Sequence, residues 1–127
     1  MIIDTHTHVV SSDKVKHPLD SGASGWSLEV SNDVEDLIAE MDKAGVECAT
    51  LVQPNGTYAL DNSYQCDSAK QYSPRTVSVG ILDPAASDAA DKLSYLSLIH
   101  ISEPTRPERM CDGGGGVGKK KSSGGGW

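Results

Sequence analysis

The chain opens with MIIDTHTHVV, residues 1–10, and this stretch decides the predicted fold. An apolar start leads into Asp4 and then into two histidines, His6 and His8, spaced two residues apart. Side chains two apart in a β-strand point to the same face, so a strand here places both imidazoles side by side at its end. Neutral imidazole is a common ligand of zinc and similar metals. The pattern therefore predicts a divalent metal site, with zinc as the expected ion, and points to metal-assisted hydrolysis or a related lyase reaction.

Beyond this stretch, the first 95 residues alternate between strand-like and helix-like segments. Such alternation implies a parallel sheet with right-handed crossovers. The residues that end the strands, His8, Gln53 and Asp83, then emerge at one edge, where TIM barrels and open α/β sheets hold their chemistry. The expected strands cover about 2–6, 46–53 and 76–82, and the expected helices cover 32–45, 62–72 and 85–95.

Helix signals are clearest between residues 32 and 45. Asn32 is expected to cap this helix together with Glu35, and Gly45 is expected to end it. After the second strand, the Pro-Asn-Gly sequence at 54–56 predicts a turn. An apolar stripe at helical spacing is expected to face the core; it comprises Val34, Leu37, Ile38 and Met41.

Length and charge limit the function classes. The net charge of −7 argues against a nucleic-acid partner, whose footprint is usually basic. No apolar run approaches the roughly 20 residues that cross a membrane, so no membrane partner is expected. The first residues lack the basic start and apolar core of a signal peptide, which makes a cytoplasmic location the expectation.

The 127 residues have room for one domain, whereas a complete (β/α)8 TIM barrel needs roughly 250. The expected fold class is therefore α/β, as a truncated TIM barrel of about three βα units. Three units leave a parallel sheet edge exposed, so self-association through that edge is also expected.

Residues 96–127 differ in composition from residues 1–95. The first part holds fifteen acidic and six basic residues, the second three acidic and five basic, and eight of the thirteen glycines lie between Gly113 and Gly126. Such a segment cannot bury apolar surface and is expected to be disordered. Its start, Leu96 to Arg106, resembles the translation of a sequencing-library adapter. We therefore expect two parts, a barrel portion over 1–95 and a non-native or disordered tail over 96–127.

Residues 1–95 resemble the amidohydrolase-related family of metal-dependent TIM-barrel enzymes, in the branch of aminocarboxymuconate semialdehyde decarboxylase and pyrone dicarboxylate lactonase. The resemblance implies that His6 and His8 are two of the metal ligands. In that family, further histidines and a catalytic aspartate come from later strands, so no catalytic residue is expected in this chain. The runs that carry the resemblance are 3–8, 37–46, 51–54, 61–64 and 79–84.

The resemblance also implies a reaction. The intact parent is expected to be a metal-dependent hydrolase acting on a small carboxylated lactone or cyclic acid. Gln53, Tyr58 and Asn62 are candidates for substrate contact, with an ordinary role as polar loop residues as the alternative. Catalytic zinc usually takes three protein ligands and the match supplies two, so the chain itself is expected to be inactive. Two alternatives stay open: a metal-dependent decarboxylase (a carbon–carbon lyase) of the same family, and a non-catalytic truncated product.

Overall fold

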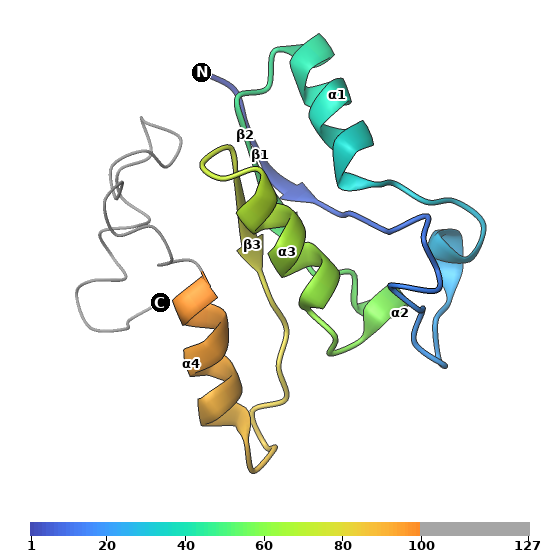
Figure 1. The fold of residues 1–127 in the computed structure, drawn as a ribbon, viewed down its shortest axis with the longest axis vertical. Coiled ribbons are helices and arrows are strands. Elements are labelled where there is room, and N and C mark those ends of the chain that lie inside the picture. The colour runs from blue at the N-terminus through green and yellow to red at the C-terminus, as the bar shows by residue number, and fades with distance from the viewer. Residues whose placement is uncertain (100–127) are drawn as a thin grey trace.

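The computed structural model describes residues 1–99, which form a three-stranded sheet with helices against it (Figure 1). The strands are β1 (Ile3–Thr7), β2 (Cys48–Val52) and β3 (Thr76–Val79), and they lie side by side in that order. Both neighbouring pairs are parallel, as the strand–helix alternation predicts. Most of the predicted tail, from residue 100 onward, lies outside the described residues.

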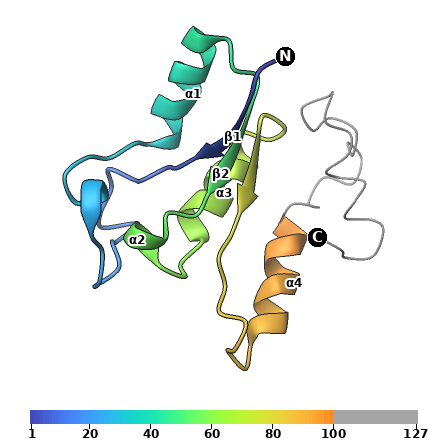
Figure 2. The same cartoon turned by 180° about the vertical axis from the view of Figure 1, so that it is seen from behind.

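The helices follow the strands along the chain. In Figure 1, α3 lies in front of β2 and β3, and in Figure 2 it lies behind them, so it covers one face of the sheet. A short 3-10 helix, η1 (Gly25–Leu28), interrupts the long polar loop after β1. The α-helices are α1 (Val34–Ala44), α2 (Asn55–Tyr58), α3 (Ser63–Gln71) and α4 (Ala89–Ile99).

The core lies where α1 and α3 pack against the sheet. Burial of this apolar surface is the main favourable contribution to folding. The predicted stripe of α1 is confirmed, because Val34 and Met41 are 2 % and 3 % exposed and the two residues between them pack on the core cluster. That cluster comprises Val9, Val34, Leu51 and Ala69, with Leu37, Ile38, Tyr64 and Tyr72 packed against it.

Three local predictions need correction or adjustment. Asn32 does not cap α1; the N-cap residue is Asp33, without a side-chain capping bond, because Asn32 is held in a two-bond bridge to Val10. The Pro-Asn-Gly sequence begins the short helix α2 instead of a turn. The helix predicted over 85–95 instead covers Ala89–Ile99, so it crosses residue 95, where the boundary between the barrel portion and the tail is predicted. This division of the chain into two parts stays a prediction.

Gly45 ends α1 as predicted. Its φ of 72° lies in the left-handed region, where glycine carries no side-chain penalty. Its N–H reaches back to the carbonyl of Asp42, and the next residue, Val46, bonds the carbonyl of Met41. These bonds close the helix and turn the chain toward β2.

The sheet is open at both sides, since neither β1 nor β3 has a second partner strand among residues 1–99. Ile3 and Val79 are 41 % and 45 % exposed on these outer strands. Self-association through an edge stays a prediction. Within the described part of the chain, no helix is both long and apolar enough to cross a membrane.

Candidate metal centre

The two histidines bring their ring nitrogens together at the end of β1. The Nε2 atoms of His6 and His8 lie 3.3 Å apart. The ring centroids are 4.9 Å apart and the ring planes stand at 89°, so the rings meet edge to face. His6 is exposed and His8 is half-buried, which leaves the pair open to solvent. Both side chains thus project to the same side, as their spacing in the sequence predicts.

The irregular pairing of β1 with β2 determines on which face of the sheet the two histidines lie. Asp4 pairs with Ala49 and Thr7 pairs with Leu51, so three steps along β1 span two steps along β2. This is the pairing of a β-bulge, in which one extra residue is accommodated. Residues paired across neighbouring strands share a face, and Leu51 belongs to the core. Thr7 therefore lies on the core face, and the two histidines that flank it lie on the open face.

His8 is fixed by its neighbours on two sides. Its Nδ1 lies 2.8 Å from the backbone oxygen of Val52, which ends β2. A carbonyl oxygen only accepts hydrogen bonds, so Nδ1 carries the hydrogen and Nε2 of the neutral ring keeps its lone pair. On the other side, the Asn32 side-chain amide donates to the backbone oxygen of His8 across 2.8 Å. Ring orientation and backbone are therefore both held.

The arrangement fits two ligands of one divalent ion. Zinc–nitrogen bonds of about 2.0–2.1 Å and a tetrahedral angle place two ligand nitrogens about 3.3–3.4 Å apart, which matches the separation of the two Nε2 atoms. A metal-binding histidine usually donates its other ring N–H to a carbonyl or carboxylate, as His8 does here. Among residues 1–99, however, no three His, Cys, Asp or Glu side chains converge on one point. The described part of the chain thus offers two ligands and no third.

The side chain of Gln53, one of the predicted substrate contacts, is buried and makes its hydrogen bonds inside the fold. It is 2 % exposed, and its side-chain amide donates to the carbonyls of Ala59 and Asp61 across 3.0 and 2.8 Å. These bonds tie the connection between α2 and α3 to the end of β2. The Gln53 Oε1 atom is buried and has no hydrogen-bond partner within the described residues.

Tyr58, the second predicted substrate contact, is likewise buried and hydrogen-bonded inside the fold. It is 4 % exposed, and its hydroxyl oxygen accepts a hydrogen bond from the backbone N–H of Ser11 across 2.9 Å. Burial raises the pKa of the Tyr58 hydroxyl above its ordinary value. The side chain therefore fastens the loop that follows the histidine pair.

Asn62 holds the segment after β3 in a two-bond clamp. Its Nδ2 donates to the Ile81 oxygen across 2.7 Å, and its Oδ1 accepts from the Ile81 N–H across 2.8 Å. Gly80 permits this close approach, since a Cβ there would come within 2.9 Å of the Asn62 Oδ1. The hydrogen bonds of Gln53, Tyr58 and Asn62 all match an ordinary structural role. Substrate contact by these three residues stays a prediction.

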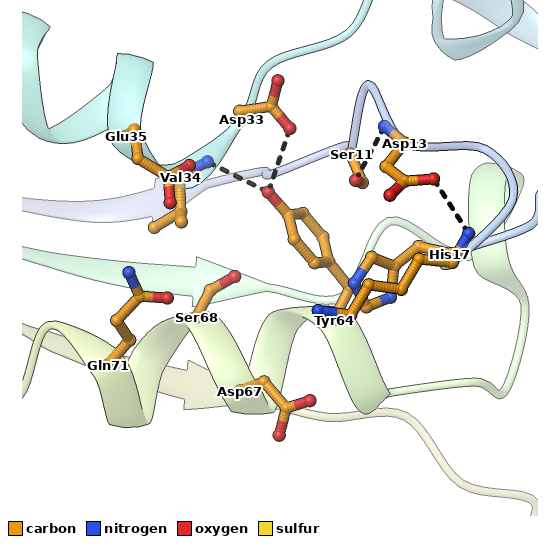
Figure 3. A pocket seen from close by; sticks show the side chains of 11 residues that line it. Ser11, Asp13, His17, Asp33, Val34, Glu35, Tyr64, Asp67, Ser68 and Gln71 are labelled. Atoms are coloured by element: carbon orange, nitrogen blue, oxygen red, sulfur yellow. Dashed lines mark hydrogen bonds between the residues drawn. The ribbon is translucent and has the colours of Figure 1, made fainter.

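A second polar cluster lines a hollow of about 240 Å³ between the start of α1 and α3 (Figure 3). The Tyr64 hydroxyl donates to Asp33 Oδ1 across 3.3 Å and accepts from the Val34 N–H across 3.1 Å. Burial raises the pKa of Tyr64 to about 12. The His17 ring lies against Tyr64, with centroids 4.6 Å apart. No pattern in the sequence marks this cluster, because its members are far apart along the chain and share no motif.

The chain is similar in structure to solved bacterial proteins. One, from Acinetobacter baumannii with citric acid bound, is named a "probable 2-pyrone-4,6-dicarboxylic acid hydrolase"; the TM-score is 0.55 at 22% identity, and the match covers 77% of this chain and 34% of that chain. A candidate for the same hydrolase from Pseudomonas putida gives a TM-score of 0.59 at 18% identity, over 76% and 33% of the two chains. An apo protein from Agrobacterium tumefaciens gives 0.58 at 20% identity, over 75% and 34%.

This chain shares their fold. The match spans about a third of each solved protein's length, which is the extent of about three βα units in a barrel of eight. The predicted fold class, a truncated (β/α)8 barrel, is therefore confirmed. No protein-family model matches the chain, and no curated protein matches its sequence. At these identities the likeness shows the fold alone.

Proposed function

We propose that the chain is the opening part of a metal-dependent hydrolase of the amidohydrolase type. The observation that supports this most is the 3.3 Å separation of the His6 and His8 Nε2 atoms, with the His8 ring held by Val52. The hydrolase names of two structural neighbours, and the resemblance of the first strand to that family, support the same proposal. In the whole enzyme, the proposed substrate is a small carboxylated lactone or cyclic acid.

His6 and His8 would hold one divalent ion, for which zinc is the proposed identity. Such an ion, when bound, supplies a Lewis acid beside a reacting oxygen. The chain contributes the orientation of its two ligands: the Val52 oxygen fixes the His8 tautomer, and the Asn32 amide fixes the His8 backbone. The open sheet face contributes access, since His6 is exposed to solvent.

The 127-residue chain itself is proposed to be inactive. Catalytic zinc sites usually take three protein ligands, and residues 1–99 bring two together. The decarboxylase alternative shares both histidines, so it is distinguished by the product formed. When the full-length enzyme that carries this sequence is given 2-pyrone-4,6-dicarboxylate, ring opening is expected; carbon dioxide release from an acidic substrate would assign the lyase reaction instead.

The metal site is tested on the chain as it exists. Calorimetric titration with Zn²⁺, and Co²⁺ absorption as a second probe, are expected to show one ion bound per chain. His6→Ala and His8→Ala are each expected to weaken binding by at least about tenfold, since each removes a ligand. His17→Ala is the matched control, because it removes an imidazole outside the pair, and it should bind as the wild type does. Equal binding by all four proteins would refute the site.

A further inference from the structure

The bulge in β1 determines where the two ligands point. Regular pairing from Asp4 with Ala49 onward would place His6 opposite Leu51. Because a shift of one residue moves every following side chain to the other face of a sheet, His6 and His8 would then lie on the core face. The extra residue instead places Thr7 opposite Leu51 and leaves the histidines on the open face.

Asp4 stabilises this irregular stretch from within. Its Oδ1 accepts a hydrogen bond from the backbone N–H of His6 across 3.0 Å. A bulge disrupts the regular ladder of strand hydrogen bonds, so its backbone groups need other partners. A short carboxylate two residues earlier reaches such an N–H directly, as aspartate does in local turns. This hydrogen bond joins Asp4, the residue before the bulge, to His6, the first of the two proposed ligands.

We propose that Asp4 is a positioning residue: its carboxylate stabilises the bulge that directs His6 and His8 onto the open face of the sheet. The inference rests on the proposed metal site, but the geometry it describes exists without a metal. Asp4 is not proposed as a ligand. Its effect on the ion passes through the position of the His6 backbone.

The experiment compares Asp4→Ala with Asp4→Asn in the 127-residue chain. Asparagine keeps an oxygen that accepts the His6 N–H, whereas alanine removes it. Asp4→Ala is expected to bind Zn²⁺ about 10- to 100-fold more weakly, the usual loss when a group that orients a metal ligand is removed. Asp4→Asn is expected to stay within about threefold of the wild type, because the lost charge is exposed and screened. Asp67→Ala, which removes an exposed carboxylate from α3, is the control for charge alone.

A measurement without metal separates this inference from the proposed function. Proton NMR of the metal-free wild type is expected to show a cross-peak between the side chains of Thr7 and Leu51, which are paired on the core face. Regular pairing would place His6 opposite Leu51 and would move Thr7 to the other face, so the cross-peak reports the bulge. The cross-peak is expected to persist in Asp4→Asn and to disappear in Asp4→Ala, with circular dichroism unchanged. If the wild type has the cross-peak but binds no Zn²⁺, the proposed function fails and the positioning role stands.

Two results would overturn the positioning role. In one, Asp4→Ala keeps both the cross-peak and wild-type Zn²⁺ affinity. In the other, Asp4→Ala loses the circular dichroism of the folded chain, since the carboxylate would then serve the fold as a whole and not the direction of two side chains.

Discussion

The His8 Nδ1 donates its hydrogen to the backbone oxygen of Val52 across 2.8 Å, and this bond joins the end of β1 to the end of β2. It fixes both the orientation of the ring and its tautomer, because only a protonated nitrogen can donate to a carbonyl. The lone pair of Nε2 is thereby directed toward His6. One backbone oxygen thus prepares a side chain on a different strand to act as a ligand.

The His8 tautomer can be measured directly. Nitrogen NMR of the metal-free chain is expected to show His8 with its hydrogen on Nδ1 and with slow exchange of that hydrogen. His17, whose ring lies against Tyr64, is the internal control and should not show this protection. A His8 ring protonated on Nε2 instead would mean that the bond to Val52 does not form in solution.

Asn62→Ala is expected to lower the free energy of unfolding by about 1–3 kcal/mol, because it leaves both backbone groups of Ile81 without their side-chain partner. Urea unfolding followed by circular dichroism measures the change. Asn55→Ala, which alters an exposed asparagine in α2, is the matched control and should lie within about 0.5 kcal/mol of the wild type. Equal losses in both variants would contradict a specific clamp.

Gly45→Ala is expected to destabilise the chain by about 1–2 kcal/mol, since alanine at a φ of 72° meets the left-handed penalty that glycine avoids. Gly56→Ala is the companion variant. A Cβ there would meet only ordinary contacts, the nearest at 3.7 Å, so no comparable loss is expected. Thermal unfolding of the two variants side by side tests the prediction, and a loss confined to Gly56→Ala would contradict it.

Alkaline pH is expected to weaken the fold through Tyr64. Its pKa is raised from 10.0 to about 12 in the folded chain, chiefly by burial, so the folded state keeps a proton that the unfolded state releases. The stabilisation is therefore complete below about pH 10 and is lost as pH rises toward about 12.

Urea unfolding at a series of pH values measures this loss. Tyr64→Phe should show a shallower decline than the wild type above pH 10, because phenylalanine has no hydroxyl to titrate. Tyr95→Phe, at a residue 66 % exposed, should decline as the wild type does. Identical curves for all three proteins would exclude Tyr64 as the source.

The elements of the fold follow from local patterns that the sequence displays. The stripe of α1 and the glycine at its end were predictable because helical spacing and a left-handed C-terminus leave direct signals. Asn32 was misassigned because the same residue type can cap a helix or hold a neighbouring strand end. Its contacts with His8 and Val10, which lie far away along the chain, decide between these roles.

For the candidate site, the sequence predicted which two histidines come together but not how. Their spacing indicates a shared face, yet the bulge that sets that face depends on pairing with β2, which no pattern within residues 1–10 contains. The Val52 oxygen is a backbone atom, so residue identity carries no sign of its role. The bonds that occupy Gln53, Tyr58 and Asn62 likewise arise only once distant loops meet.

The order β1-β2-β3 has a consequence for any attempt to build a closed barrel around these strands. A closed barrel that includes these three strands must pair further strands with two free edges, one on β1 and one on β3. Both of these edges belong to this chain. A complementing polypeptide must pair with both edges together, because pairing with one edge alone leaves a new strand with a free edge. Reconstitution would therefore be all-or-none, and a complement lacking either of its outermost strands would leave the ring unclosed.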